Sequence, residues 1–81
     1  MRFVVRADRS IVVAFEPTAA EHRLEPGSVM TVEWFGGGDD GMVSMEAEYL
    51  VIAAPTGGYT RAWESDGMEI YIGAESGSEA H

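Results

Sequence analysis

The sequence predicts an all-β fold, a small antiparallel β-sandwich or barrel of about six strands. Short runs of β-branched and aromatic residues recur along the chain. Glycine, proline and aspartate turn signals separate these runs at intervals of roughly 8–12 residues, as in small all-β domains. One segment departs from the β pattern: the crossover after the second strand is expected to contain a short helical turn.

The first two expected strands span residues 2–6 and 11–16. The Ala-Asp-Arg-Ser segment between them, residues 7–10, is typical of a tight connection, so the two strands are expected to form a hairpin. Both strands also carry apolar residues, such as Val4 and Val12, on the face that alternation would leave in solvent. This two-sided apolar pattern predicts cover from a second sheet or from another subunit.

A crossover of small and polar residues follows the second strand. The segment 18–21, Thr-Ala-Ala-Glu, has the form of a capping box, in which a hydroxyl and a carboxylate bond the backbone N–H groups at the start of a helix. The motif predicts a short helix that ends near Leu24. The Pro-Gly pair at 26–27 then predicts a type II turn into the next strand.

The segment 28–53 is predicted to form the central hairpin of the fold. It alternates apolar and polar residues around a glycine-rich centre, residues 36–41. A two-residue loop at 38–39, with glycine leading, is typical of a type II′ hairpin turn. In the register set by that turn, Trp34 lies beside Val43 on the buried face.

The same register predicts a carboxylate-rich outer face. Glu33, Glu46 and Glu48 fall together on it, with Phe35 beside Met42 at its end. Paired carboxylates can perform acid–base chemistry on glycosides, but a chain of this size leaves little room for a concave sugar site. The cluster is interpreted as a docking face for a basic partner or as a solvated strand face. In the second case arginines would partly neutralise it, namely Arg2, Arg6 or Arg61.

Two further strands are expected at 59–64 and 68–72. Before them, at 50–52, alternation stops and both faces become apolar, which indicates either a bulge or cover on both sides. Residues 1–73 are expected to form a single β domain. Residues 74–81 are small and acidic without an apolar anchor, and are expected to form a flexible tail.

The charge balance favours some partner classes and disfavours others. Fourteen Asp and Glu face five Arg and no Lys, for a formal net charge of −9. Nucleic acids and anionic membrane surfaces need a cationic surface, which this composition does not supply. A partner selected by charge would be basic, although net charge also serves solubility alone. No signal peptide or membrane-spanning run is visible, so a cytoplasmic location is expected.

The sequence contains no motif that is specific to catalysis, metal binding or cofactor binding. The chain has no cysteine, and its histidines are His22, in the crossover, and His81, the last residue. Neither has a sequence context that would position it beside a nucleophile. The acidic loops at 39–40 and 64–66 lack the spacing of a calcium-binding loop. We therefore expect no enzyme activity, no metal site and no cofactor.

The aromatic residues supply the remaining functional candidates. Trp34, Tyr49 and Phe15 are expected in the core, whereas large aromatics on the later strands are harder to bury. Exposed aromatics among charges are typical of protein interfaces and of sugar-stacking platforms. The residues expected to contact a partner are Glu33, Glu46, Glu48, Phe35, Trp63 and Tyr71.

Three functions remain open from the sequence. The first is a non-enzymatic, acidic protein-interaction domain of inhibitor, immunity or accessory type. The second is a small-ligand or carbohydrate-binding module that uses exposed Trp and Tyr. The third is a structural subunit of a homo-oligomer, since a chain of this size has a thin core.

Overall fold

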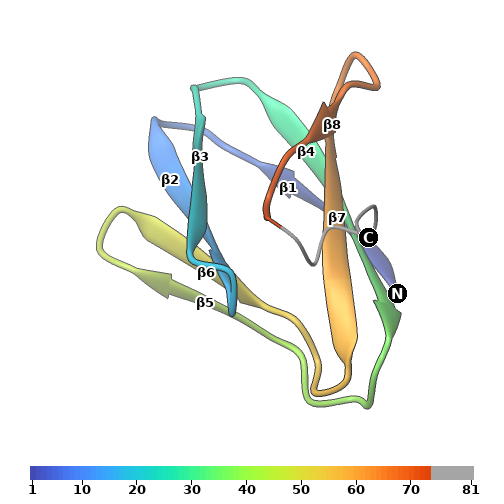
Figure 1. Ribbon diagram of the computed structural model, residues 1–81. Coiled ribbons are helices and arrows are strands. Elements are labelled where there is room, and N and C mark those ends of the chain that lie inside the picture. Colours follow the sequence, from blue (N-terminus) through green and yellow to red (C-terminus); the bar gives the residue numbers. More distant parts are fainter. Residues whose placement is uncertain (74–81) are drawn as a thin grey trace.

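The computed structural model describes residues 1–73, which form eight strands in two four-stranded sheets (Figure 1). The strands are β1 (Arg2–Arg6), β2 (Ile11–Glu16), β3 (Ala20–Leu24), β4 (Val29–Gly36), β5 (Met42–Glu46), β6 (Tyr49–Ala53), β7 (Gly58–Glu64) and β8 (Glu69–Ile70). The first sheet has the order β1-β4-β7-β8 and the second the order β3-β2-β6-β5. The expected acidic tail, residues 74–81, lies outside the described residues.

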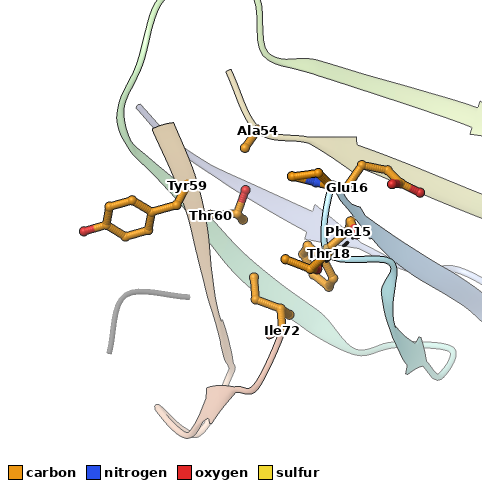
Figure 2. Close-up of a pocket in the computed structure, with 8 residues that line it drawn as sticks. Phe15, Glu16, Thr18, Ala54, Tyr59, Thr60 and Ile72 are labelled. Carbon is orange, nitrogen blue, oxygen red and sulfur yellow. Dashed lines mark hydrogen bonds between the residues drawn. The ribbon is translucent and has the colours of Figure 1, made fainter. Parts of the chain in front are cut away.

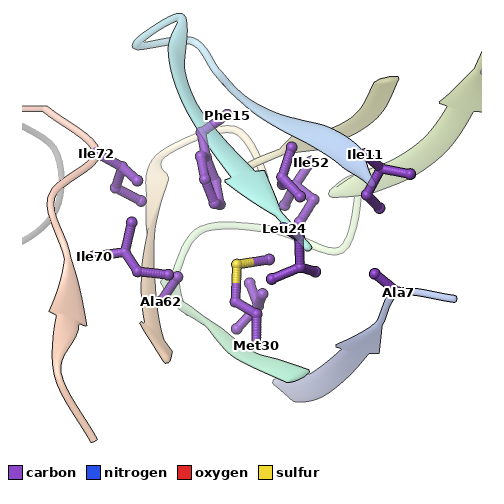
Figure 3. Packing of buried hydrophobic residues seen from close by; sticks show 11 residues of the cluster. Ala7, Ile11, Phe15, Leu24, Met30, Ile52, Ala62, Ile70 and Ile72 are labelled. Atoms are coloured by element: carbon purple, nitrogen blue, oxygen red, sulfur yellow. The ribbon is translucent and has the colours of Figure 1, made fainter. Parts of the chain in front are cut away.

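The two sheets share one hydrophobic core (Figure 3). Alternation along β2 and β4 directs every second side chain inward, and Val13, Met30 and Val32 are fully buried there. Burying a side chain of this size contributes about 1.5–3 kcal/mol relative to leaving it in water. The core residues are Ala7, Ile11, Val13, Phe15, Leu24, Met30, Val32, Ile52, Ala62, Ile70 and Ile72. The all-β class is therefore confirmed, with eight strands in place of about six.

The expected hairpin between residues 2–6 and 11–16 is wrong. β1 pairs antiparallel with β4 in the first sheet, and β2 belongs to the second sheet. Both strands have an apolar inner face, so packing them across the core buries more apolar surface than pairing them edge to edge. The connection is fixed by Ala7, whose N–H donates to the Ser28 carbonyl (3.1 Å) and whose carbonyl accepts from the Gly27 N–H (2.8 Å).

The expected helical turn at 18–21 is also wrong: Thr18 and Ala19 lie in the tight turn of a β2–β3 hairpin, and Ala20 and Glu21 already belong to β3. Phe15 lies opposite Ala20 in its register. The Thr18 hydroxyl accepts from the Ala20 N–H and donates to the Phe15 carbonyl, each at 3.3 Å. Ala19 takes a left-handed conformation with φ of 66°. A threonine that can cap a helix can equally close a turn, and here β3 buries Leu24 against the core.

The central hairpin of 28–53 does not form. β4 pairs with β1 and β7, while β5 pairs with β6 in the other sheet. The glycine-rich segment 36–41 carries the chain from one sheet to the other. Trp34 therefore packs edge-on against Phe3, with ring centroids 5.2 Å apart, and Val43 lies opposite Ile52. β4 therefore pairs with two strands, whereas in an isolated hairpin it would pair with one.

The loss of alternation at 50–52 reflects a central strand rather than a bulge. β6 pairs parallel with β2 on one side and antiparallel with β5 on the other, in unbroken register. Ile52 points into the core beside Phe15, and Val51 lies half-exposed beside Ala14 on the outer face. The parallel pair departs from the antiparallel sheet that the sequence predicts. No helix in residues 1–73 is long and apolar enough to cross a membrane.

One glycine in the first sheet has no room for a side chain. Gly58 lies opposite Gly36, and a Cβ at Gly58 would stand 2.7 Å from the Phe35 carbonyl oxygen. Gly58→Ala should therefore lower the free energy of unfolding by about 1–3 kcal/mol. Urea unfolding measures this change.

The matched control is Gly38→Ala in the neighbouring loop. A Cβ at Gly38 would meet only the Asp40 carboxylate, at an ordinary 3.7 Å. Its unfolding free energy should stay within about 0.5 kcal/mol of the parent. Equal urea midpoints for Gly58→Ala and Gly38→Ala would contradict the close approach of the two backbones.

Candidate functional site

The outer face of the first sheet gathers aromatic and arginine side chains from three strands, β1, β4 and β7, with Glu69 of β8 at its edge. Core residues such as Val32 and Ala62 point inward, so their neighbours along each strand point outward. We call this surface the aromatic–arginine face. It consists of Arg2, Val4, Arg6, Val29, Thr31, Glu33, Phe35, Tyr59, Arg61, Trp63 and Glu69.

An aromatic pair occupies one end of this face. Phe35 and Tyr59 lie directly opposite each other in the β4–β7 register, and their rings stack with centroids 5.3 Å apart and planes 13° apart. Figure 2 shows Tyr59 pointing away from the core, where its neighbour Thr60 points inward. Such a pair contributes about 0.5–1.5 kcal/mol beyond its buried area. The stack is thus a firm, partly exposed apolar platform.

Trp63 lies further along the same face of β7, next to two arginines. The guanidinium carbon of Arg61 is 5.3 Å from the indole centroid and that of Arg2 is 5.8 Å away. Both distances are within the range of cation–π attraction. Beside them Val4 is 60% exposed, so a large apolar side chain adjoins the cationic cluster in solvent.

Two ion pairs fix the orientation of these arginines. Arg2 bonds Glu33 across β1 and β4 at 2.8 Å, and Arg61 bonds Glu69 with two hydrogen bonds of 2.8 and 2.6 Å. The hydrogen bonds from Arg61 hold the pKa of Glu69 below its ordinary value of 4.5, and they raise the pKa of Arg61. A forked guanidinium–carboxylate pair restricts both side chains to one geometry.

The local charge of this face differs from that of the whole chain. Three arginines and two glutamates lie on it, which leaves one net positive charge on a protein whose formal net charge is −9. The pairing of Arg2 with Glu33 confirms that an arginine neutralises this carboxylate. The face is therefore amphipathic and close to neutral.

The structure divides the sequence-predicted contact residues between the two sheets. Glu33, Phe35 and Trp63 come together on the aromatic–arginine face. Glu46 ends β5 and Glu48 lies in the turn that follows, both exposed and both in the second sheet.

The predicted three-glutamate cluster does not form, because its strands β4 and β5 belong to different sheets. Tyr71 follows β8 and is 79% exposed.

The sequence prediction left out Arg2, Tyr59 and Arg61 as contact residues. Alternation along 59–63 already placed Tyr59, Arg61 and Trp63 on one face. The missing information was the position of β1 beside β4, which brings Arg2 to Trp63.

The cavities of the described chain do not offer an enclosed ligand site. The cavity in Figure 2, between Phe15, Thr60 and Ile72, has a volume of about 10 Å³, near the minimum for one water molecule. A more open cleft of about 390 Å³ lies over Trp34 and the glycine-rich loop. Among the described residues that line it, Asp39 supplies the one carboxylate, so their polar recognition is limited.

The oxygen-rich loop at 39–40 has a structural explanation. Asp40 accepts hydrogen bonds from the Thr56 N–H (2.8 Å) and hydroxyl (2.6 Å), which lower the pKa of this carboxyl. It thereby ties two loops that connect the sheets. His22 lies 3.8 Å from the Glu64 carboxylate, between β3 and β7. Within residues 1–73 no three His, Asp or Glu side chains converge as metal ligands.

The Arg61–Glu69 pair predicts a pH effect. Arg61→Gln should return the pKa of Glu69 toward 4.5, because the hydrogen bonds that stabilise the carboxylate are lost. Since the folded-state pKa of Glu69 lies below its unfolded value, the pair stabilises the fold above about pH 4.5 and loses this effect as the pH falls through the folded pKa. Carboxyl ¹³C NMR titration measures the shift.

Arg2→Gln is the matched control for this titration. It removes an arginine from the same face but leaves the partner of Glu69 in place, since Arg2 bonds Glu33. The Glu69 titration should be unchanged in it. An equal response to both substitutions would mean that general electrostatics, rather than the Arg61 fork, sets this pKa.

No protein-family model, curated protein or solved structure matches this chain.

Proposed function

We propose that this chain is a non-enzymatic protein-interaction domain, of inhibitor, immunity or accessory type, that binds its partner through the aromatic–arginine face. The observation that carries the proposal is Trp63, half-buried between Arg2 and Arg61 on an outer sheet surface. Tryptophan, tyrosine and arginine are the residue types that dominate binding energy at protein interfaces. All three types adjoin here on β7.

The geometry also favours binding through low ordering cost. The guanidinium of Arg61 is held by Glu69 and that of Arg2 by Glu33 before any partner arrives. Immobilising a long side chain on binding costs about 0.5–1.5 kcal/mol. Side chains that are already oriented avoid much of that cost, as does a sheet surface that needs no rearrangement.

The local charge also informs the chemistry of the partner. The near-neutral face suits a protein surface with an apolar anchor surrounded by carboxylates or backbone carbonyls, which can accept the remaining guanidinium N–H groups. The net charge of −9 favours a basic partner. The glutamates of this chain that were expected to bind it are divided between the two sheets, so they do not form one acidic surface. Long-range attraction of a basic partner would raise the association rate more than the affinity of the complex.

A carbohydrate-binding module is the second candidate, and the stacked Phe35–Tyr59 pair is the observation that favours it. Sugar stacking needs a free aromatic face. Trp63 has two guanidinium groups near its ring, which a sugar would have to displace. The protein partner is therefore the better-supported proposal.

The test of the proposal is partner capture with matched variants. Trp63→Ala should lose a bound protein that the parent chain retains, with at least a tenfold fall in affinity, about 1.4 kcal/mol or more, as for an interface anchor. Tyr49→Ala is the control, because Tyr49 is an aromatic on the second sheet that is 44% exposed. Isothermal titration with the captured protein measures the difference. An equal fall in affinity in both variants would contradict the proposal that the aromatic–arginine face is the binding surface.

The carbohydrate candidate has its own readout. A Trp34→Phe background leaves Trp63 as the only tryptophan, since the chain has two. Titrating this protein with a glycan panel should leave Trp63 fluorescence unchanged if the partner is a protein. Saturable quenching by one glycan would support the carbohydrate module instead.

A further inference from the structure

β5 is an edge strand whose apolar side chains are uncovered on both faces. Met42 is 59% exposed, Val43 44% and Met45 48%. Val43 and Met45 lie on the same face as Leu50 and Ile52, their partners on β6, yet the first sheet does not cover them. Figure 1 shows β5 at the outer end of its sheet, beside β6.

The backbone of β5 has N–H and C=O groups that point away from β6, on a side where no described strand pairs with them. The turn between β5 and β6 has two residues, so Glu46 and Tyr49 form the hydrogen-bonded pair that flanks it. Alternation then directs the backbone groups of Met42 and Ser44 toward β6. The N–H and C=O groups of Val43 and Met45 point to the free edge.

Charge distinguishes β5 from the other edge strands. The sheet ends are β1, β8, β3 and β5. β1 begins and ends with arginine, β3 has Glu-His-Arg at its centre, and β8 is two residues long and begins with glutamate. Charged residues and short strands protect edges from pairing with other chains. β5 has no charge from Met42 to Met45 and no proline.

We propose that β5 pairs antiparallel with β5 of a second copy of this chain, about a two-fold axis at Ser44. Val43 then lies opposite the partner subunit's Met45, and Met45 opposite the partner subunit's Val43. These two pairs exchange four backbone hydrogen bonds, since both residues direct their N–H and C=O groups outward. The β3-β2-β6-β5 sheet of one copy then joins the same sheet of the second copy, which gives one continuous sheet of eight strands.

The strand is self-complementary in this register. The four uncovered Val and Met side chains form one apolar strip on the inner face. Glu46 lies opposite the partner subunit's Met42, so the two glutamates are offset by four residues, or about 13 Å at about 3.3 Å per residue. This exceeds the screening length of about 8 Å at physiological salt. A second copy therefore matches the edge without opposing like charges.

The net charge predicts how the dimer responds to salt. Each copy has a formal net charge of −9, which opposes association at low ionic strength. The dimer should form more readily as salt is added. A charge-driven complex with a basic protein would weaken under the same change, which separates the two kinds of association.

A single cysteine tests the register. The chain has no cysteine, and Ser44→Cys places one thiol at the two-fold axis, where the Cα atoms of a non-hydrogen-bonded pair are about 4.5 Å apart. This spacing allows a disulfide between copies, and mild oxidation should give a covalent dimer. Glu46→Cys is the control, because its thiols lie too far apart to join. Equal cross-linking of both variants, or of neither, would overturn the register.

Sedimentation of the uncross-linked protein tests the edge itself. Met45→Pro removes an outward N–H but leaves the β5–β6 hydrogen bonds in place, and Val43→Lys adds a charge to the same edge. Both variants should remain monomers where the parent dimerises. Val4→Lys is the matched control, since Val4 is an exposed valine on β1. A parent chain that stays monomeric at high salt and high concentration would overturn the proposal.

The two proposals fail separately because they use different sheets. Trp63→Ala should leave the dimer intact, and Val43→Lys should leave capture by the aromatic–arginine face intact. If Val43→Lys abolished capture of a foreign protein while the parent stayed monomeric, β5 would be a docking edge for that protein, and the dimer would be wrong.

Discussion

Two strands that never pair with each other, β2 and β4, carry the side chains at the centre of this molecule. Val13 and Phe15 of β2, and Met30 and Val32 of β4, belong to the core shared by the two sheets, and their exposed fractions are 1% or less. A chain of 81 residues buries only a modest share of its surface, so both sheets depend on this one core for stability. Placing β2 and β4 face to face sends β1 and β7 to the flanks of β4 and creates the outer surface where Trp63 lies.

The sequence predicts the all-β class and most strand positions because alternation is a local property. It does not predict which strands become neighbours. At 28–53 the alternating pattern fits one hairpin as well as it fits three strands divided between two sheets, and only the competition for core space decides between them. At 18–21 a threonine motif that serves helix caps and tight turns alike predicts a helix, and the chain instead forms a turn and the start of β3. Both errors come from long-range packing that no short window contains.

In the candidate site, too, the sequence predicts what local alternation determines but not what strand pairing determines. Tyr59, Arg61 and Trp63 share a face because they alternate on one strand, and this much is readable from the sequence. Arg2 reaches Trp63 only because β1 lies beside β4, where Arg2 pairs with Glu33, 31 positions further along the chain. The predicted glutamate cluster needed the hairpin and was lost with it. What remains is a surface defined by preorganised arginines rather than by acidic charge.

The parallel contact between β2 and β6 has a consequence for how the chain reaches this structure. Val13 and Leu50 are neighbours across that pair, so a long stretch of chain must be closed into a loop before the second sheet acquires its centre. The hairpins β2–β3 and β5–β6 can form early from local contacts, but they stay separate until this closure joins them. Folding rates fall as such distant pairings come to dominate a topology. The uncovered edge of β5 is open to other chains during that closure as well as in the folded chain, so β5 is a site at which folding competes with aggregation.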